Sequence, residues 1–592
     1  MKIPMSQTQS EKLHLKTECS IRGATEILYI FLLLAMGAVI LFINAGGWDL
    51  WNPDEPRYAQ VAREMMQTGN YLVPHINREI YPDKPPLFFW LIALASQPFG
   101  DVTAASARIP SAIAALWVVL LTYLWGRKLY NPTVGVLAGL ILLSTTQFVW
   151  MALRANIDMT LTLWTTLALF LFYVGYTRKT RNSAWYLCSY GVMGLAVLTK
   201  GPVGFAIPLI TMVLFLCSQK QFKDIKTIAL GKGALVIAGV TALWLVPACL
   251  SGGGEYAREI IFKQTIGRTV DSFSHKQPFY YYLINFPADF NPWIFFVPSA
   301  VVYCWRTIKR GKTMNLRFPL LWFLGTLVFF SLISGKRSLY LMPLYPAAAL
   351  LMGRFWYDVI AQPAPDMQIS RSPLLTVPGY LLFGALVLSS IIFGVLMGTG
   401  ADSSFLREFD IDLKTVPLFP LLTILGIGGV VGLLCLIKKV RPLFLFSIIV
   451  MVMFAGFIFT VRNIFPSINA AKSARPFCDR INTIVKPHDK LVAFRFDPES
   501  FNYFLNRTPI PVINEYEKLK ELLNSPETVY CLILSRHFDQ APAEEKNTVT
   551  VLDESQIGHR KYYLIARQTG GPITSNSFSI TAHATPPFPR LE

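Results

Sequence analysis

Long apolar runs, separated by short polar stretches, fill the first three quarters of the chain. An α-helix rises about 1.5 Å per residue, so about 20 apolar residues cross a hydrocarbon core of roughly 30 Å. Thirteen runs approach this length, at residues 25–46, 107–126, 133–153, 157–176, 184–199, 202–218, 231–250, 292–308, 318–334, 339–356, 375–397, 416–437 and 442–461. The pattern predicts a polytopic α-helical membrane protein with about 13 transmembrane helices.

The lysines and arginines predict its orientation. Basic clusters lie between alternate runs, at residues 127–128, 178–181, 220–232, 306–317 and 438–441. Such clusters mark cytoplasmic loops. We therefore expect a cytoplasmic amino terminus at 1–24 and a transmembrane catalytic domain at 25–461, with periplasmic loops at 44–105 and 251–291.

One further apolar stretch is too short to span. Leu87–Ala95 covers about 14 Å as a helix, and counting it as a span would reverse the charge bias of every later loop. We expect residues 86–99 to form a helix along the outer membrane surface.

The composition changes after residue 461. Residues 490–496 and 529–535 have strand patterns, residues 498–506 and 515–523 have helical ones, and 549–552 with 562–566 resembles a hairpin pair. We predict a small periplasmic α/β domain at 462–592. Its last stretch, 570–592, is rich in Pro, Ser and Thr, which is typical of a disordered tail.

Composition separates a membrane protein from a nucleic-acid binder. Of the 592 residues 53% are hydrophobic and only 15% are charged, yet the formal net charge is +18. Because the basic residues are divided among short inter-helix loops, membrane orientation explains them better than a nucleic-acid surface does. We expect membrane lipids, and no nucleic acid, as partners.

The first outward loop carries the motif Trp51-Asn52-Pro53-Asp54-Glu55-Pro56-Arg57-Tyr58. If a helix begins after Pro53, Asp54 and Tyr58 share one face and Glu55 points elsewhere. Asp54 is then a candidate general base, or a stabiliser of developing positive charge, and Arg57 is a donor fork for phosphate. Alternatively, Asn52 or Asp54 only caps the helix, with Arg57 and Arg63 in surface ion pairs.

A second motif, Tyr81-Pro82-Asp83-Lys84-Pro85-Pro86, precedes the short apolar stretch. Its prolines favour a rigid turn. Lys84 suits phosphate as a point charge, and Asp83 is a candidate ligand for a divalent metal ion. No ligand spacing is diagnostic of that metal, and an exposed ion pair is the plainer alternative.

Other charged residues stand at the same outer face. Asp158 starts a long run, where helix capping is the alternative to catalysis, and Lys200 lies in a sharp turn. Lys336 and Arg337, followed by Tyr340, depart from the cytoplasmic bias, so we predict a phosphate site there. In the loop 251–291 we assign Arg268 to phosphate; His275 has no second histidine at ligand spacing.

Taken in order, these motifs resemble a known family. The Trp51–Tyr58 string, Val73-Pro74-His75, the Tyr81–Pro85 string, Ala155-Asn156-Ile157-Asp158, Thr199-Lys200-Gly201 and Ser334-Gly335-Lys336 with Tyr340 resemble the bacterial lipid A aminoarabinose transferases. These are grouped with protein O-mannosyltransferases among the class C glycosyltransferases. The resemblance covers roughly residues 25–360.

The resemblance implies a class C glycosyltransferase fold in the bacterial inner membrane, with its active site on the periplasmic face. It implies an undecaprenyl-phosphate-linked sugar as donor, typically 4-amino-4-deoxy-L-arabinose, and a lipid A phosphate as acceptor. Asp54 matches the family acid, with Asp158 as a second catalytic candidate. The candidate binders of the carrier phosphate are Arg57, Tyr81, Lys84, Arg268, Lys336 and Tyr340. Asp83 stands where the family usually has Glu, and Pro56 where Thr is common.

Two alternatives remain open at this point. The acceptor can instead be a protein hydroxyl or another glycan, for which Asp54 must act as a true base. A transporter or flippase is the alternative of another class. Such proteins usually place charges near the bilayer midplane in two matching halves, whereas here the charges collect at one face.

Overall fold

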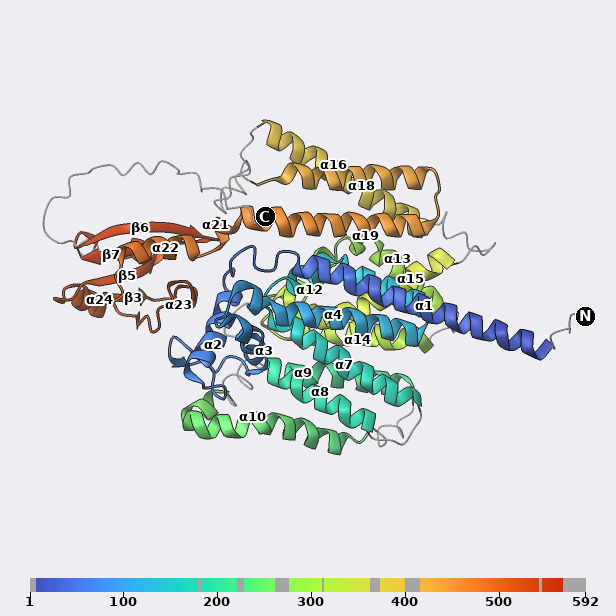
Figure 1. Ribbon diagram of the computed structural model, residues 1–592, viewed down its shortest axis with the longest axis horizontal. Helices are drawn as coiled ribbons and strands as arrows, with labels where there is room; N and C mark the ends of the chain where they lie inside the picture. Colours follow the sequence, from blue (N-terminus) through green and yellow to red (C-terminus); the bar gives the residue numbers. More distant parts are fainter. Residues whose placement is uncertain are drawn as a thin grey trace, which may run out of the picture. The chain divides into compact units, whose positions relative to one another are not determined.

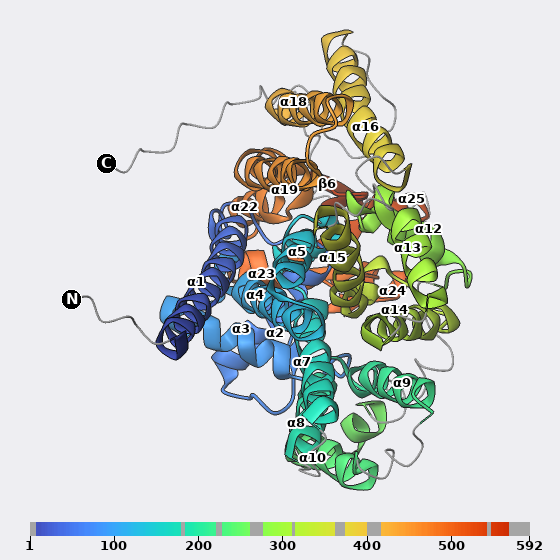
Figure 2. The ribbon, with the colours of Figure 1, turned by 90° about the vertical axis from the view of Figure 1, so that its right-hand side faces the viewer.

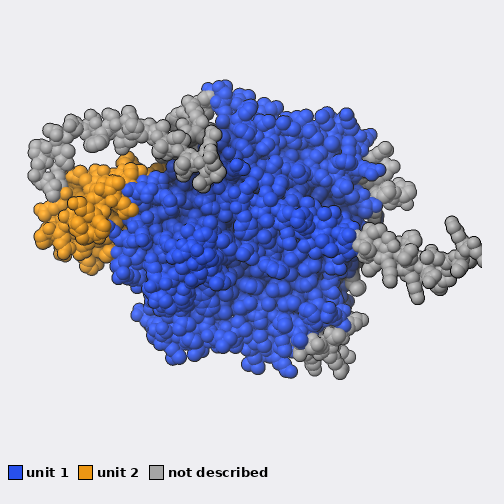
Figure 3. Space-filling model, in the orientation of Figure 1, with its two compact units in different colours: residues 1–479, 498–509, 557–559 blue, residues 480–497, 510–556, 560–592 orange. Residues whose placement is uncertain are grey.

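The computed structural model describes residues 7–178, 184–220, 228–260, 276–310, 314–361, 373–399, 416–541 and 546–567. The chain forms two compact units (Figure 3). Unit 1 comprises residues 1–479, 498–509 and 557–559, and unit 2 comprises residues 480–497, 510–556 and 560–592.

All thirteen apolar runs are helical in the described parts of the chain. The helices are α1 (Gln7–Phe42), α4 (Ala104–Leu129), α5 (Pro132–Leu143), α6 (Thr146–Ala152), α7 (Ile157–Arg178), α8 (Ala184–Lys200), α9 (Val203–Ser218), α10 (Leu230–Arg258), α13 (Val297–Lys309), α14 (Met314–Leu332), α15 (Tyr345–Ala361), α16 (Pro373–Thr399), α18 (Leu418–Ile437) and α19 (Pro442–Phe459). The protein is a multi-pass membrane protein.

By a strict length test, the part of the chain that the structure describes has fewer membrane-spanning helices than the thirteen predicted from the sequence. Among the described residues, eight helices are long and apolar enough to cross a membrane, and a ninth results if α5 and α6, bent by 70°, count as one. Helices α8, α9, α13 and α15 have 17, 16, 13 and 17 residues. Two of them follow 3₁₀ segments, η4 (Trp293–Phe296) and η5 (Ser338–Leu344), which divide their apolar runs. The count of thirteen is therefore not confirmed.

Helix α4 packs against α1, α5, α7 and α15 in unit 1, and α1, α4 and α7 run side by side (Figures 1 and 2). Its crossing with α5 requires glycine, because a Cβ on Gly126 would lie 2.7 Å from the Cα of Gly135. Near the same crossing the rings of Trp125 and Trp322 pack at a tilt of 32°, with centroids 5.0 Å apart. Close backbone approach and large aromatic rings together fix this helix within the bundle.

The loop between α1 and α4 is itself folded. It contains α2 (Asp54–Thr68), the antiparallel pair β1 (His75–Ile76) and β2 (Glu79–Ile80), and α3 (Leu87–Ser96), followed by the turn η1 (Gln97–Phe99). The predicted short helix is confirmed: it has ten residues and buries Phe88, Phe89 and Ile92 in a cluster that includes Tyr58. Its placement along the membrane surface stays a prediction.

Unit 1 continues beyond the last long helix and also includes a later segment. Residues 460–472 form the π-helical turn η7 (Thr460–Ile464) and short helices α20 (Phe465–Ser467) and α21 (Asn469–Lys472), and α22 (Arg475–Ile484) follows. Helix α23 (Glu499–Leu505) lies after the first strand of unit 2 in sequence, yet it packs on α2. The compact carboxy-terminal unit thus begins at Arg480, later than the residue 462 expected from composition.

Unit 2 is a small α/β unit around a five-stranded sheet of order β4-β3-β5-β7-β6. The strands are β3 (Lys490–Phe494), β4 (Val512–Ile513), β5 (Val529–Leu534), β6 (Val549–Ile557) and β7 (Arg560–Arg567), with α24 (Tyr516–Leu523) and α25 (Ser535–Asp539). Strand β3 pairs in parallel with β4 and β5, whereas β5 and β7 are antiparallel. The predicted strands, helices and β6–β7 pair are confirmed; residues 570–592 lie outside the described residues.

Candidate active site

Two acid–base pairs meet at one end of the helix bundle of unit 1. Asp54 is the first residue of α2, and its Oδ2 accepts a hydrogen bond from Arg337 Nη2 at 2.9 Å, just before η5. Asp158, in the first turn of α7, pairs with Lys200, the last residue of α8. The Lys200 ammonium also lies 4.1 Å from the centre of the Tyr340 ring, in η5. Four chain segments therefore bring acids and cations together.

Asp54 is an ionised carboxylate in this setting. Its side chain is 14% exposed and that of Arg337 is 30% exposed. Burial alone would raise the pKa of Asp54, but Arg337, with Arg57 and Arg154 further away, lowers it below its ordinary value. A carboxylate with a lowered pKa is a weak base, but it offers a permanent negative charge.

Asp158 does not cap its helix with its side chain. The Oδ1 of Asn156 accepts a hydrogen bond at 2.8 Å from the Asp158 backbone N–H, which satisfies that free donor. The Asp158 carboxylate is 2% exposed and is directed to Lys200 instead. The capping alternative for Asp158 is wrong, and the chemical role stays open.

Arg57 lies one turn after Asp54 on α2. Its Nε is 2.8 Å from Oε1 of Glu499, and its Nη2 donates to Oε2 at 3.3 Å. Burial would lower the pKa of Arg57, but Glu499, then Tyr81 and Asp54, raise it above its ordinary value. Burial is the main cause that raises the pKa of the Tyr81 phenol, and Asp83 raises it further. The positive charge of Arg57 acts in the opposite direction. Tyr81 and Arg57 are thus electrostatic neighbours; their binding of the carrier phosphate stays a prediction.

The other predicted phosphate binders have different surroundings. Lys84 lies in the turn before α3, and its ammonium donates to the Asp83 carbonyl at 3.1 Å. Lys336 is 3% exposed and donates to the Gln277 carbonyl at 2.9 Å and to the Ile333 carbonyl, so its ammonium is engaged by the backbone. The geometry favours Arg337 over Lys336 as the cation that faces Asp54. Arg268 and His275 lie outside the described residues.

The donor set around Asp83 does not fit a resident divalent metal ion. Across the described parts of the chain, no group of three or more His, Cys, Asp and Glu side chains is arranged to hold one. A divalent cation needs several oxygen ligands, and Asp83 alone offers too few. The metal ion stays a prediction, and no chemical step is assigned to one.

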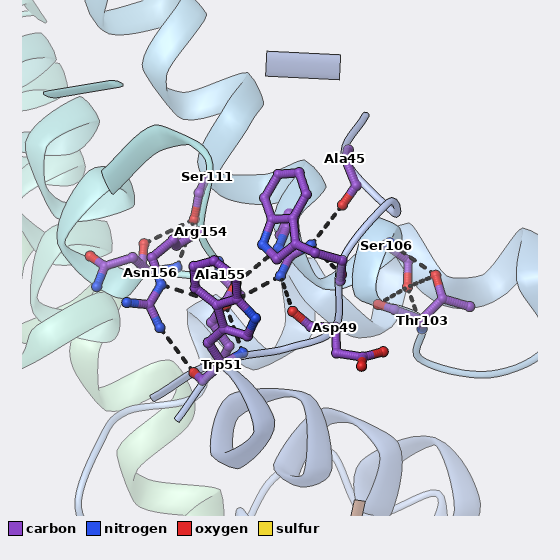
Figure 4. Close-up of polar contacts among 12 residues, drawn as sticks. Ala45, Asp49, Trp51, Thr103, Ser106, Ser111, Arg154, Ala155 and Asn156 are labelled. Carbon is purple, nitrogen blue, oxygen red and sulfur yellow. Dashed lines mark hydrogen bonds and ion pairs between the residues drawn. The ribbon is translucent and has the colours of Figure 1, made fainter. Parts of the chain in front are cut away.

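Glu55, adjacent to Asp54, belongs to a separate buried network. It is fully buried, and its carboxylate accepts hydrogen bonds from Arg108 Nε at 2.9 Å and from the backbone N–H groups of Trp51 and Ala155 at 3.0 and 2.9 Å. Arg108 also donates to the carbonyls of Ala45, Trp48 and Asp49. Figure 4 shows this network, in which Arg154 donates to the Trp51 carbonyl at 2.9 Å. It fixes the loop that presents Asp54.

Two alternatives drawn from the sequence are wrong. Helix α2 has no side-chain cap, because Pro53 occupies the cap position. Arg63 is 7% exposed, pairs with Asp101 at 2.7 Å and donates to the Tyr503 carbonyl, so it is not in a surface pair.

Sequence reasoning missed the roles of Arg108 and Glu499, and it named Lys336 instead of Arg337 among the phosphate binders. Arg337 has extended backbone angles (φ −138°, ψ 142°), in which successive side chains point to opposite sides. One of Lys336 and Arg337 therefore faces the site, but the sequence alone does not show which of the two it is. Glu499 lies 442 residues from Arg57, so no local sequence pattern predicts the pair.

Known proteins are similar to this chain in sequence and in architecture. Residues 26–258 match the family described as dolichyl-phosphate-mannose-protein mannosyltransferase. The crystal structure of ArnT from Cupriavidus metallidurans, bound to undecaprenyl phosphate, superposes with a TM-score of 0.73 at 19% identity, over 91% of this chain and 98% of that one. The chain has the fold of that structure. The resemblance predicted from the motifs is confirmed.

Sequence relatives are named as arabinosyl transferases. The undecaprenyl phosphate-alpha-4-amino-4-deoxy-L-arabinose arabinosyl transferase 1 of Pseudomonas fluorescens is 32% identical over 52% of this chain and 55% of its own length. The enzyme of that name from Serratia proteamaculans is 30% identical, over 63% of this chain and 65% of its own length. The chain thus spans between about half and two thirds of these relatives, and its activity, substrates and partners are proposals.

Proposed function

We propose that this chain is a membrane glycosyltransferase that moves 4-amino-4-deoxy-L-arabinose from undecaprenyl phosphate to a phosphate of lipid A. The observation that carries the proposal is the meeting of Asp54 with Arg337, and of Asp158 with Lys200 and Tyr340, at the ends of α2, α7, α8 and η5. The fold is that of a transferase solved with undecaprenyl phosphate. We place the site at the periplasmic face of a bacterial inner membrane, since the basic clusters mark the opposite loops as cytoplasmic.

The reaction is a displacement at the anomeric carbon of the sugar. The bond from this carbon to the carrier phosphate oxygen breaks, its electron pair stays on the departing phosphate, and an acceptor oxygen bonds to the carbon. Negative charge grows on the leaving phosphate while the ring becomes positive. Cations fixed beside the phosphate bind it more tightly as its charge develops, which lowers the barrier. We assign this role to Arg57, Lys84, Arg268 and Arg337.

The state of Asp54 favours a phosphate acceptor over a hydroxyl. Its lowered pKa makes it a weak base, and a hydroxyl acceptor requires a base to take its proton. An ionised phosphate needs no such base. Asp54 then orients the acceptor and stabilises the positive ring with its charge.

A protein hydroxyl is the second candidate acceptor, because the matching family is described by protein mannosylation. The test incubates purified protein with labelled polyprenyl-phosphate sugar and either lipid A or a serine- and threonine-containing peptide. Label on lipid A alone supports the proposal, and label on the peptide alone supports the second candidate. Movement of the donor across a vesicle bilayer with no transfer would indicate a flippase and contradict both.

A further inference from the structure

Residues 498–509 follow the first strand of the carboxy-terminal sheet, but they are part of unit 1. We propose that this segment completes the active site, with Glu499 as a positioning residue that holds the Arg57 guanidinium for the carrier phosphate. The proposal rests on the transferase function above. It assigns catalytic importance to a part of the chain that composition groups with the outer domain.

The segment is anchored to α2 by buried hydrogen bonds. Arg63 on α2 donates to the Tyr503 carbonyl at 2.8 Å, and its guanidinium lies 4.1 Å from the centre of the Tyr503 ring. Gln60 on α2 donates to Thr508 Oγ1 at 3.1 Å. Bonds to buried charged groups are stronger than ordinary surface ones. Helix α23 is therefore held on α2 near its carboxy-terminal end.

The same segment also contacts the chain that follows α2. The Tyr503 hydroxyl donates to the Val102 carbonyl at 2.8 Å, and Asn502 Nδ2 donates to Asn77 Oδ1 at 2.9 Å. Asn502 is fully buried and Tyr503 is 6% exposed. A carboxylate carried by so fixed a segment costs little entropy to hold in place.

Glu499 contacts the guanidinium group of Arg57, which the proposal directs to the carrier phosphate. Arg57 is three residues after Asp54, so both side chains project from neighbouring positions on the surface of α2. The Arg57 Nη2 donates to Oε2 of Glu499 at 3.3 Å, and its Nε lies 2.8 Å from Oε1 as an ion-pair contact without a hydrogen bond. Because a guanidinium has five N–H donors, the pair leaves other donors for a phosphate oxygen. The Arg57 side chain is 28% exposed, which leaves it accessible to a ligand.

Fixing a long side chain before binding raises affinity, because less conformational entropy is lost when the ligand binds. A competing interpretation is autoinhibition, in which Glu499 occupies Arg57 and must be displaced by the donor phosphate. The two interpretations predict opposite changes in donor affinity. Positioning requires that loss of the Glu499 charge weakens donor binding, and autoinhibition requires that it strengthens it.

The test compares Glu499→Gln with wild type in the full-length protein. The first readout is the Kd for undecaprenyl phosphate, and the second is the KM and kcat for transfer. We expect the Kd and the donor KM to rise about tenfold, the size of one charge-assisted hydrogen bond, with kcat reduced less. Glu499→Asp keeps the charge and should recover part of the affinity. Glu521→Gln, on an exposed position of α24, is the matched control and should equal wild type.

A double-mutant cycle with Arg57→Ala decides whether Glu499 acts through Arg57. Positioning predicts that the double variant binds no worse than Arg57→Ala alone. Effects that simply multiply, an unchanged Kd in Glu499→Gln, or tighter binding in it would each overturn the proposal. Failure of wild type to transfer sugar while it still binds undecaprenyl phosphate would instead refute the transferase function. Equal thermal unfolding of all variants shows that folding is intact.

Discussion

Two adjacent carboxylates on α2 have opposite surroundings. Glu55 is fully buried, and Arg108 and two backbone N–H groups satisfy it from three chain segments. Asp54 is partly exposed and meets the partly exposed Arg337. The first arrangement leaves Glu55 no capacity for a ligand, whereas the second leaves Asp54 accessible. The comparison separates a residue that holds the loop from one that we propose serves the chemistry, although one peptide bond links them.

The largest effect should follow from breaking the buried pair. Arg108→Ala leaves the Glu55 charge uncompensated in the interior, and we expect a loss of about 3 to 5 kcal/mol in the free energy of unfolding. Thermal unfolding in detergent checks this. Arg127→Ala, at the other end of α4, breaks a pair with Glu26 in which the arginine is 48% exposed, and should cost less than about 1 kcal/mol. Equal losses would mean that the Glu55 network is not structural.

The next largest effect concerns the exposed pair. Arg337→Ala should reduce transfer about a hundredfold, because a cation facing the reacting groups is removed, with little change in stability. Initial rates with labelled donor measure it, and the exposed Arg78→Ala is the control. If Lys336→Ala were the damaging change and Arg337→Ala harmless, the assignment of these two residues would be reversed.

A smaller effect tests Tyr340. Its ring lies under the Lys200 ammonium, and such a contact is worth about 0.5 to 2 kcal/mol. Tyr340→Phe keeps the ring and should stay within about threefold of wild-type transfer, whereas Tyr340→Leu should lose about tenfold. Equal losses in the two variants would show that the hydroxyl, and not the ring, matters.

The smallest effect is a pH shift. Because the pKa of Asp54 is lowered from 3.8, its charge is retained above that value and is lost only as the pH falls further. Titration of Asp54 should therefore not affect wild-type transfer between about pH 5 and 8. Removing Arg337 leaves burial to raise the pKa of Asp54, so the acid limb of Arg337→Ala should move to higher pH. Coincident pH profiles of residual activity would contradict this electrostatic account.

The sequence predicted periodic and local features well. The apolar runs became helices, and the helical phase after Pro53 correctly separated Asp54 from Glu55. The strands of unit 2 followed from their alternation. These features depend on residues close together in the chain, where period and side-chain direction are linked.

Long-range ion pairs were not predictable in this way. Arg108 is 53 residues from Glu55 and Glu499 is 442 residues from Arg57, and no spacing rule connects such residues. Lys336 was preferred to Arg337 because the extended backbone before η5 is not visible in the sequence. The two compact units also differ from the domains expected from the sequence, because residues 498–509 belong to unit 1 and not to the unit that contains the sheet.

The central claim is that Asp54 serves the reaction and not the fold or the donor affinity. The most direct test is Asp54→Asn, which keeps the size of the side chain and removes its charge. Transfer to lipid A and the Kd for undecaprenyl phosphate are measured on one preparation. We predict that transfer falls more than about a hundredfold while the Kd stays within about twofold. Wild-type transfer by this variant would contradict the account.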